Sequence, residues 1–371
     1  MSYSLATLWY ERHRYLPGVL AVGFSALLIA LQCGLLLGLF SITSIPVDNT
    51  GADIWVGAPE VLSVDLGRPV PDSYLLRVAS QPGVSQLEHY LQGFAYWNKP
   101  SGGFELCVVI GSRLEHDALG AIKELTPELR ARLTEPGAIV VDESDLGRLG
   151  IKGIGDVAEI TGQRVRVVGI IKGVHSLAGP YVFGSLATAR PLLRLFPEQT
   201  TYVLAKCKHK ADAPAIVERL RDYPKMSAFT RDEFSLRTRM HWLTKTKAGI
   251  ALGLAAALGL LVGAVVTSQT LYAATAACIR EFAVLQALGI PRWRMAMTVL
   301  AQSFWVGVIG IGVATPVVIA LKQGAEIIRA PLQLPSWLLA SAVAVTMTMA
   351  LLSGLAALRS LRLVEPATLL R

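Results

Sequence analysis

The sequence has little charge. Only 17% of its 371 residues are Asp, Glu, Lys or Arg, and its mean hydropathy is +0.48. Soluble domains carry about 25% charged residues, so this deficit indicates contact with lipid. Charge is missing altogether from four long runs, residues 15–47, 248–279, 295–321 and 330–358. Each exceeds the roughly 20 apolar residues that a helix needs to cross a bilayer, so we predict four transmembrane helices.

Motifs for common hydrolytic and metal chemistry are also missing. The sequence has no G-x-x-x-x-G-K-[ST] phosphate-binding loop, no H-E-x-x-H, no C-x-x-C and no G-x-S-x-G. We therefore predict that the chain is not an enzyme and binds no cofactor or metal of its own. The predicted spans carry no Asp, Glu, Lys or Arg, which argues against an ion-coupled carrier and against a channel with a charged filter.

The formal net charge of +8 is concentrated near the predicted spans. Residues 48–247 contain 25 Lys and Arg against 23 Asp and Glu, a net of +2, and the other 10 basic and 4 acidic residues flank the spans. Basic flanks are typical of membrane proteins, whereas a nucleic-acid surface would concentrate positive charge on the globular part. We therefore expect the lipid bilayer as a partner and no nucleic acid.

The amino terminus has the basic residues and the apolar run of a signal peptide. The run is about twice as long as the apolar region of a signal peptide, and it has no A-x-A cleavage site, so we interpret it as a retained span. Before it, Leu5, Leu8 and Trp9 lie on one face of a helix. This spacing predicts a short amphipathic helix on the inner membrane surface.

Basic residues in short loops mark the cytoplasmic side of a membrane protein. Here they gather before the first span, between the second and third, and after the fourth: Arg12, Arg14, Arg280, Arg292, Arg294, Arg359, Arg362 and Arg371. We predict that both termini are cytoplasmic and that the long region between the first two spans is outside. A basic cluster at the outer end of the second span opposes this rule, and we interpret it as part of a helix that continues beyond the bilayer: Arg237, Arg239, Lys245 and Lys247.

The outer region has the pattern of a mixed α/β or α+β domain, with one or two subdomains. The predicted strands are residues 138–142, 157–160, 164–171 and 201–206, and a turn at 161–163 joins the second and third into a hairpin. Helical spacing of apolar residues predicts helices over residues 73–80, 185–195 and 211–221. The domain also contains Cys107 and Cys207, whose spacing leaves a disulfide open.

The connection between the second and third spans has its own helical pattern. Glu281 suits a helix start, the apolar residues Phe282, Leu285 and Leu288 recur at every third position, and Gly289 suits a helix end. Such an apolar face either binds a partner or packs on the protein's own spans. In the second span, Gly249–Gly253 together with Gly259 and Gly263 predicts close helix contact, within one chain or across a dimer.

These features together resemble the MacB/FtsX-like permeases of ABC transporters. One span, a large outer domain and three further spans is their layout. The segment IREFAVLQALGIPRWRM at Ile279–Met295 is similar to their signature after the second span, and LRLVEPATLLR at Leu361–Arg371 is similar to their closing pattern. TSQTLYAAT at Thr267–Thr275 and GADIWVG at Gly51–Gly57 resemble the DevC branch, whose members are permeases of tripartite exporters.

The resemblance implies a homodimer that binds two copies of a separate ABC ATPase, which would hold the ATP and Mg. The segment from Arg280 would be the coupling helix on that ATPase, through Arg280, Glu281, Phe282, Leu285, Leu288 and Gly289. A periplasmic adaptor protein and an outer-membrane channel of the TolC type are the further partners implied. The second span would extend outward as a stalk, in a mechanotransmission mechanism that moves cargo without a path between the spans.

We therefore expect a multi-pass protein of the bacterial inner membrane with an inserted extracytoplasmic α/β domain. Its expected parts are an amphipathic helix (1–15), span 1 (16–46), the periplasmic domain (47–240), stalk and span 2 (241–279), the coupling helix (280–292), span 3 (293–321), an outer loop (322–333), span 4 (334–359) and a cytoplasmic tail (360–371). The leading hypothesis is export of a lipid, glycolipid or hydrophobic molecule. The alternatives are an FtsX-like signal relay to an envelope hydrolase and a lipoprotein-release permease.

Overall fold

The computed structural model describes residues 10, 12–174, 176–277, 291–327 and 332–362. The chain forms two compact units, one of residues 1–39 with 247–371 and the other of residues 40–246. The expected amphipathic helix over residues 1–15 falls almost entirely outside the described residues, as does most of the cytoplasmic tail.

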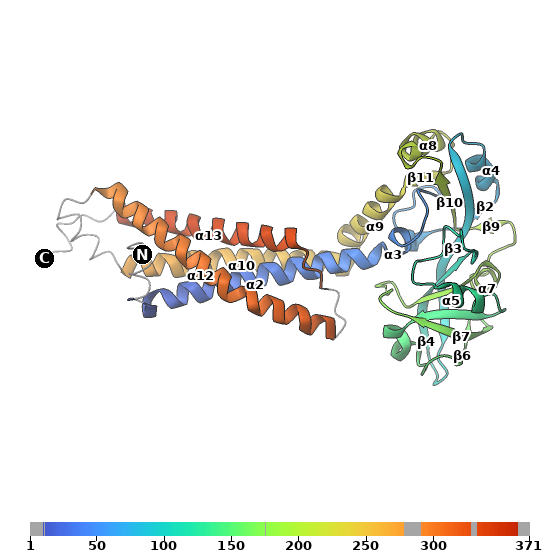
Figure 1. The fold of residues 1–371 in the computed structure, drawn as a ribbon, viewed down its shortest axis with the longest axis horizontal. Helices are drawn as coiled ribbons and strands as arrows, with labels where there is room; N and C mark the ends of the chain where they lie inside the picture. Colours follow the sequence, from blue (N-terminus) through green and yellow to red (C-terminus); the bar gives the residue numbers. More distant parts are fainter. Residues whose placement is uncertain (1–9, 11, 175, 278–290, 328–331, 363–371) are drawn as a thin grey trace. The chain divides into compact units, whose positions relative to one another are not determined.

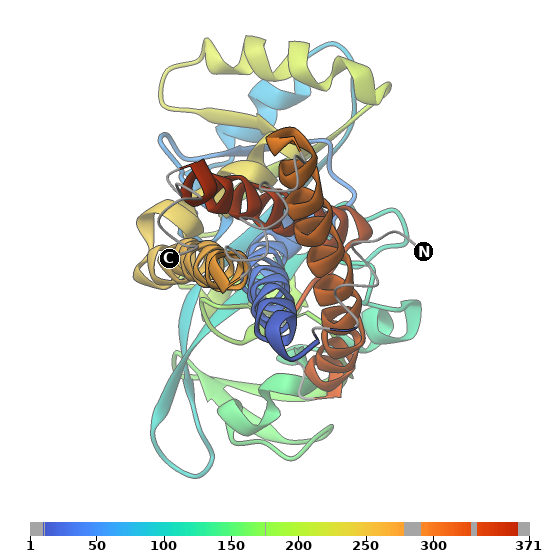
Figure 2. The ribbon, with the colours of Figure 1, turned by 90° about the vertical axis from the view of Figure 1, so that its left-hand side faces the viewer.

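The first unit is a set of four long apolar helices, shown along their length in Figure 1 and end-on in Figure 2. They are α2 (Arg12–Thr43), α10 (Lys247–Ala277), α12 (Arg292–Ile327) and α13 (Ser336–Arg362). Each is long and apolar enough to cross a membrane, which confirms the four predicted spans in length and composition. The helix over residues 12–43 begins earlier than the predicted first span because charged residues before the apolar run continue its helical backbone.

The second unit is built on one nine-stranded sheet that long strand β3 (Val84–Asn98) divides into two lobes. The first half of β3 belongs to lobe 1, with β1 (Ile54–Gly57), β10 (Tyr202–Cys207) and β11 (Ser227–Thr230). The helices of lobe 1 are α4 (Ser73–Ala79) and α8 (Ala213–Arg221). Of the two arrangements that the sequence pattern left open, the structure has two lobes joined through a shared strand.

Lobe 2 closes on itself. Its strands follow the second half of β3 in the order β4 (Phe104–Ser112), β8 (Tyr181–Ser185), β5 (Ala138–Asp142), β7 (Gln163–Ile171) and β6 (Val157–Ile160). The strand β6 pairs back with the end of β3, Ile160 opposite Trp97, and this completes the ring. Helices α5 (Pro127–Arg132) and α7 (Leu186–Leu192) belong to this lobe, as does the single turn α6 (Leu146–Leu149).

Short elements complete the unit. They are α3 (Ile45–Asp48), the 3-10 turns η1 (Val64–Leu66), η2 (Glu143–Asp145) and η3 (Lys210–Asp212), the pair β2 (Val70–Pro71) and β9 (Gln199–Thr200), and α9 (Arg231–Lys245). Trp55 lies at the centre of the largest core, with ring centroids 5.1 Å from Tyr90, 5.5 Å from Tyr202 and 5.6 Å from Phe234. Because Phe234 belongs to α9, this aromatic cluster fixes α9 to the sheet.

The local predictions within this unit are confirmed. The strand at Ala138–Asp142 has the predicted bounds, and Val157–Ile160 with Gln163–Ile171 forms the predicted hairpin. Its turn is Thr161-Gly162, both at positive φ (52° and 86°), as a two-residue type I′ turn requires. The strand predicted at 201–206 begins one residue later, at Tyr202, and the three predicted helices are present as α4, α7 and α8.

Candidate functional site

The predicted coupling helix lies outside the described residues, so the structure places none of its residues: Arg280, Glu281, Phe282, Leu285, Leu288 and Gly289. The structure does describe its flanks. The described part of α10 extends to Ala277, and α12 begins at Arg292 directly after Pro291. Proline has no N–H to contribute to a helix, so this position suits the boundary that the sequence predicts.

Small residues bring the helices of the first unit close together. A side chain on Gly263 of α10 would lie 3.2 Å from Cβ of Ser25 on α2, and one on Gly259 would lie 3.2 Å from Gln32. Between α2 and α12, a Cβ on Gly23 would lie 3.0 Å from the carbonyl oxygen of Gly310. These contacts are within one chain. Gly259 and Gly263 therefore allow the second span, α10, to pack closely against α2 of the same chain.

A polar contact strengthens the pairing of α2 with α10. The hydroxyl oxygen of Ser25, which is fully buried, lies 3.0 Å from the Gly263 carbonyl oxygen and 3.0 Å from the Thr267 hydroxyl oxygen. Hydrogen bonds of this kind between spanning helices contribute about 0.6 kcal/mol on average. The first and second spans are therefore held by both shape and hydrogen bonding.

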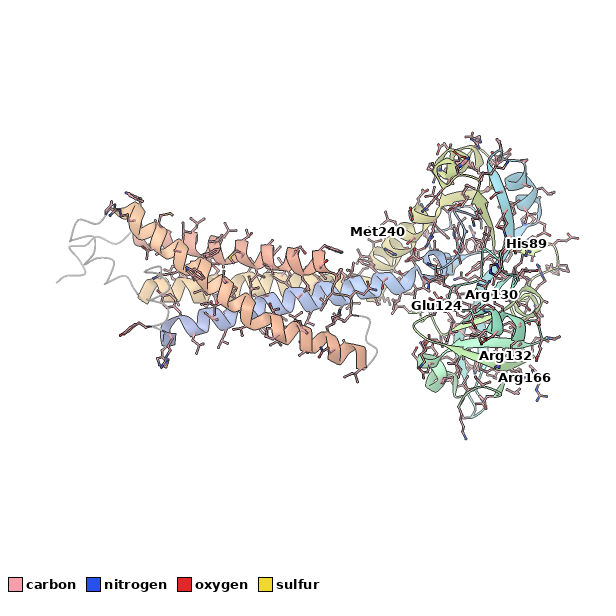
Figure 3. The ribbon with its side chains drawn as sticks, viewed as in Figure 1. His89, Glu124, Arg130, Arg132, Arg166 and Met240 are labelled. Atoms are coloured by element: carbon pink, nitrogen blue, oxygen red, sulfur yellow. The ribbon has the colours of Figure 1, made fainter. Side chains whose placement is uncertain are left out.

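In the second unit, α9 is clamped to the start of the domain by a basic residue. Arg239 donates from Nη2 to Asp48 Oδ2 at 2.6 Å and from Nε to Ser44 Oγ at 2.8 Å, and Ser44 Oγ in turn donates to Asp48 Oδ2 at 2.6 Å. Figure 3 marks this part of α9 by the neighbouring Met240. Arg231 at the start of the same helix donates to the carbonyl oxygen of Asp48. We call Ser44, Asp48 and Arg239 the clamp.

A second residue of the basic cluster before the second span also attaches α9 to the domain. Arg237 donates to the carbonyl oxygen of Val61 at 2.9 Å, and its guanidinium lies 5.1 Å from the centre of the Phe229 ring. The helix α9 then ends, and Thr246 has an extended backbone (φ −94°, ψ 146°) before α10 begins at Lys247. The range 241–279, predicted as one stalk and span, is thus divided into two helices at Thr246.

A second contact of α9 reaches a buried carboxyl group. Asp65 in η1 is 4% exposed and accepts hydrogen bonds from Trp242 Nε1 at 3.1 Å and from Gln92 Nε2 at 3.1 Å. Burial raises the pKa of Asp65 to about 6, although the bonds from Trp242 and Gln92 favour its ionised form. The three residues come from η1, β3 and α9, so this network also holds α9 to the domain.

Sequence reasoning found the basic cluster but missed these partners. Asp65 lies between Val64 and Leu66, and Asp48 directly follows the uncharged run of the first span, and these positions are the available signal. Their partners lie 191 and 177 positions away in the chain, a separation that periodicity cannot bridge. The two domain cysteines are free and buried, Cys107 in the core of lobe 2 and Cys207 in that of lobe 1. Burial raises the pKa of Cys107 to about 12, which disfavours its reactive thiolate.

Comparisons with known proteins agree with this architecture. A family model described as the MacB-like periplasmic core domain matches residues 19–223, and a model described as the FtsX-like permease C-terminal matches residues 253–366. No curated protein matches the chain.

Three solved structures are similar to about half of the chain. The periplasmic region of MacB from Actinobacillus actinomycetemcomitans is 11% identical (TM-score 0.35, covering 54% of this chain and 97% of that one). The extracellular domain of the transporter YknZ from Gram-positive bacteria is 10% identical (0.32, 47% and 98%), and a domain of a putative permease from Porphyromonas gingivalis is 12% identical (0.32, 52% and 99%). Since the MacB-like model alone spans more than half of the sequence, the chain belongs to the family of MacB-like and FtsX-like ABC permeases.

Proposed function

We propose that this chain is the permease subunit of a tripartite exporter, which relays ATP-driven motion of a separate ATPase to the extracytoplasmic domain. The family is one of ABC permeases, and the sequence contains no nucleotide-binding loop, so hydrolysis belongs to a partner subunit. The proposed partners are that ATPase, a second copy of the chain, a periplasmic adaptor and an outer-membrane channel. We propose that the chain lies in the bacterial inner membrane with both termini cytoplasmic.

The observation that carries the relay is the attachment of α9. One residue, Thr246, separates α9 from the apolar helix α10, so a movement of α10 reaches α9 through a single link. The clamp, the Asp65–Trp242 bond and the packing of Phe234 on Trp55 then attach α9 to the domain at three points. Packed side chains, hydrogen-bond networks and rigid helices are the elements that carry coupling between distant sites, and α9 has all three.

The cytoplasmic end of the proposed relay is the segment from Arg280 to Gly289. A negative residue at a helix start followed by an apolar face is suited to docking in a groove of an ATPase. Phe282 and Leu285 would lie at the centre of the apolar face. The proposed docking residues are Arg280, Glu281, Phe282, Leu285, Leu288 and Gly289.

The proposed cargo is a lipid, a glycolipid or another hydrophobic molecule taken from the periplasm or the outer leaflet. The match to the MacB-like core domain extends over residues 19–223, and this favours export over an FtsX-like signal relay to an envelope hydrolase. The resemblance of Thr267–Thr275 and Gly51–Gly57 to DevC favours glycolipid-type cargo within that class. A lipoprotein-release permease is the remaining alternative.

The relay is tested by uncoupling the clamp. The chain is reconstituted in nanodiscs with its ATPase, and ATP hydrolysis is measured with and without the adaptor. We expect the adaptor to change the rate in the wild type and to have a smaller effect with Arg239→Met, which removes one of the three attachments, while the complex and its basal hydrolysis persist. Lys245→Met, at the exposed end of the same helix, is the matched control. An adaptor effect of full size with Arg239→Met would refute a relay through the clamp.

A further inference from the structure

Lobe 2 has a groove where two parallel strands end together. The strands β4 and β8 pair in register as far as Ser112 and Ser185, so the chain leaves both strands at one edge. A cavity of about 590 Å³ lies there, between the loop after β4, helix α5 and the start of α7. A second cavity of about 350 Å³ shares Thr134, Ser185 and Ala187 with the first, so the two form one groove. Each of the two volumes is within the range of about 300–1,000 Å³ found for small-molecule sites.

The groove is mainly apolar. Its first part is lined by Leu114, Pro127, Ala131 and Leu186, and its second part by Pro191 and Leu192. These side chains follow one another from α5 along α7. A lining of this kind suits an extended apolar group, and its exposure to water in the empty protein costs free energy that a bound apolar chain would recover.

One cation of the groove is fixed in place without a carboxylate partner. Arg130 on α5 donates from Nε to the carbonyl oxygen of Leu125 at 2.8 Å and from Nη1 to that of Glu115 at 3.1 Å. In the part of the chain that the structure describes, no carboxylate forms an ion pair with it. The other Arg donors remain for a ligand, and an arginine held by backbone carbonyls is already oriented to bind an anionic oxygen.

The acid of the groove does not cancel this charge. Glu115 is the one Asp or Glu among the residues that line the two cavities. Its carboxylate accepts hydrogen bonds from Arg113 Nε at 3.2 Å and from the Leu114 N–H at 3.1 Å. The pair of Arg113 and Glu115 is therefore internally neutral, and the net charge of the groove near Arg130 is positive.

The loop after β4, which carries Arg113 and Glu115, is held in place by a buried acid on β3. Glu88 on β3 is 1% exposed and accepts hydrogen bonds from the backbone N–H groups of Arg113, Leu119 and Gly120. A buried carboxylate with three backbone donors holds a loop in one conformation, which preserves the shape of the groove before a ligand arrives.

We infer that this groove binds a single-chain anionic amphiphile, with a carboxylate, phosphate or sulfate head against Arg130 and an apolar chain along α5 and α7. The head would come from a free amphiphile or from a lipid of the bilayer, which share this chemistry. Identifying the ligand as cargo rests on the proposed export function, whereas the binding itself does not. The charge of Arg130 selects for an anion, and the lining selects for a chain.

Photolabelling of the full chain tests this site. The chain is placed in phosphatidylcholine nanodiscs, labelled with a diazirine-bearing dodecanoate or with the matching neutral dodecanol, and the labelled peptides are mapped by mass spectrometry. We expect dodecanoate to label the peptides of α5 and α7, and Arg130→Gln to reduce this labelling about tenfold, as expected for one charged hydrogen bond. Ala187→Phe, at an exposed residue that lines both cavities, should block both probes.

Arg132→Gln is the matched control. Arg132 lies on the same helix as Arg130 (Figure 3), donates to the carbonyl oxygen of Val168 and lines neither cavity. Its loss should leave the labelling unchanged. Competition by added phosphatidylglycerol would support the site with a bilayer lipid as its source, and absence of competition would support it with a free amphiphile.

Three results would overturn the inference: labels outside α5 and α7, equal effects of the Arg130 and Arg132 substitutions, or equal labelling by the neutral probe. Because no ATPase or adaptor is present, such a failure leaves the proposed relay untouched, and a failed relay leaves this binding result untouched.

Discussion

Asp65 shows how one residue of this domain responds to its surroundings. Its carboxyl group is buried beside Trp242 and Gln92, and the Oε1 atom of Gln92 has no hydrogen-bond partner in the described structure. Burial raises the pKa of Asp65 to about 6 from an ordinary value of 3.8. The folded protein therefore binds this proton more tightly than the unfolded chain does, and the bond to α9 depends on a group that titrates near neutral pH.

The pH dependence of stability follows from this pKa. Below about pH 4 the carboxyl group of Asp65 is protonated in both the folded and the unfolded state. Between pH 4 and 6 the unfolded chain loses this proton while the folded protein keeps it. The free energy of unfolding therefore falls as the pH rises through this range. The difference from 3.8 to about 6 corresponds to roughly 3 kcal/mol by pH 7. We predict that Asp65→Asn lacks this loss, since its amide can donate to Gln92 and accept from Trp242.

The measurement is the melting temperature of the full chain by tryptophan fluorescence, from pH 4 to pH 8. All other titrating groups are common to both proteins, so the difference between the two curves isolates Asp65. The advantage of Asp65→Asn should grow as the pH rises to about 6 and then stay constant. Parallel curves would show that Asp65 titrates in the folded protein as it does in water.

At the scale of elements, the spans are specified by close approach of backbones. Gly263 lies against Ser25 on α2, where an added Cβ would be 3.2 Å away, and Gly312 on α12 has no atom within 4 Å of such a Cβ. A large side chain at Gly263 would separate α2 from α10 and break the Ser25 contacts. Overpacking of this kind costs about 1–3 kcal/mol.

We therefore predict that Gly263→Leu lowers the thermal stability of the purified chain, whereas Gly312→Leu does not. Both substitutions add the same side chain to a helix long and apolar enough to cross a membrane, so they share any change in hydrophobicity. The measurement is the fraction of monodisperse protein left in detergent after heating. Equal losses for both variants would place the sensitivity in helix propensity or detergent binding and would contradict packing at Gly263.

The elements that sequence reasoning predicted are those fixed by neighbouring residues. An uncharged run determines a span, and Thr161-Gly162 between two apolar strands determines a hairpin, because a few local residues carry the signal. The double pairing of β3 is different. Its first half pairs with β10 and its end pairs with β6, and nothing in residues 84–98 alone indicates those distant partners. For the same reason the groove at Arg130 and the clamp at Arg239 could not be predicted, since each requires contacts between segments that the fold brings together.

For the whole molecule, the proposed relay assigns ATP hydrolysis to a partner subunit and the transmission of movement to this chain. The chain carries apolar helices and a mixed domain, and the sequence holds no phosphate-binding loop. In the proposed relay, energy enters from a separate ATPase subunit at a surface on the cytoplasmic side. The residues proposed for that surface, Phe282 and Leu285, are large apolar groups on the short segment between α10 and α12.

We predict that the purified chain hydrolyses no ATP and that hydrolysis requires co-expression of its ATPase. Phe282→Asp or Leu285→Asp should abolish co-purification of that ATPase, because a desolvated charge in an apolar contact costs several kcal/mol. The control is Leu254→Asn, at an exposed position of the apolar helix α10, which should leave the complex intact because it lies away from the docking segment. A complex that survives both Asp substitutions would contradict the coupling role, and turnover by the chain alone would show that it is itself an enzyme. The Phe282 and Arg239 substitutions should therefore differ in their effects. Phe282→Asp should prevent assembly with the ATPase, whereas Arg239→Met should leave the complex intact and weaken only the response to the adaptor.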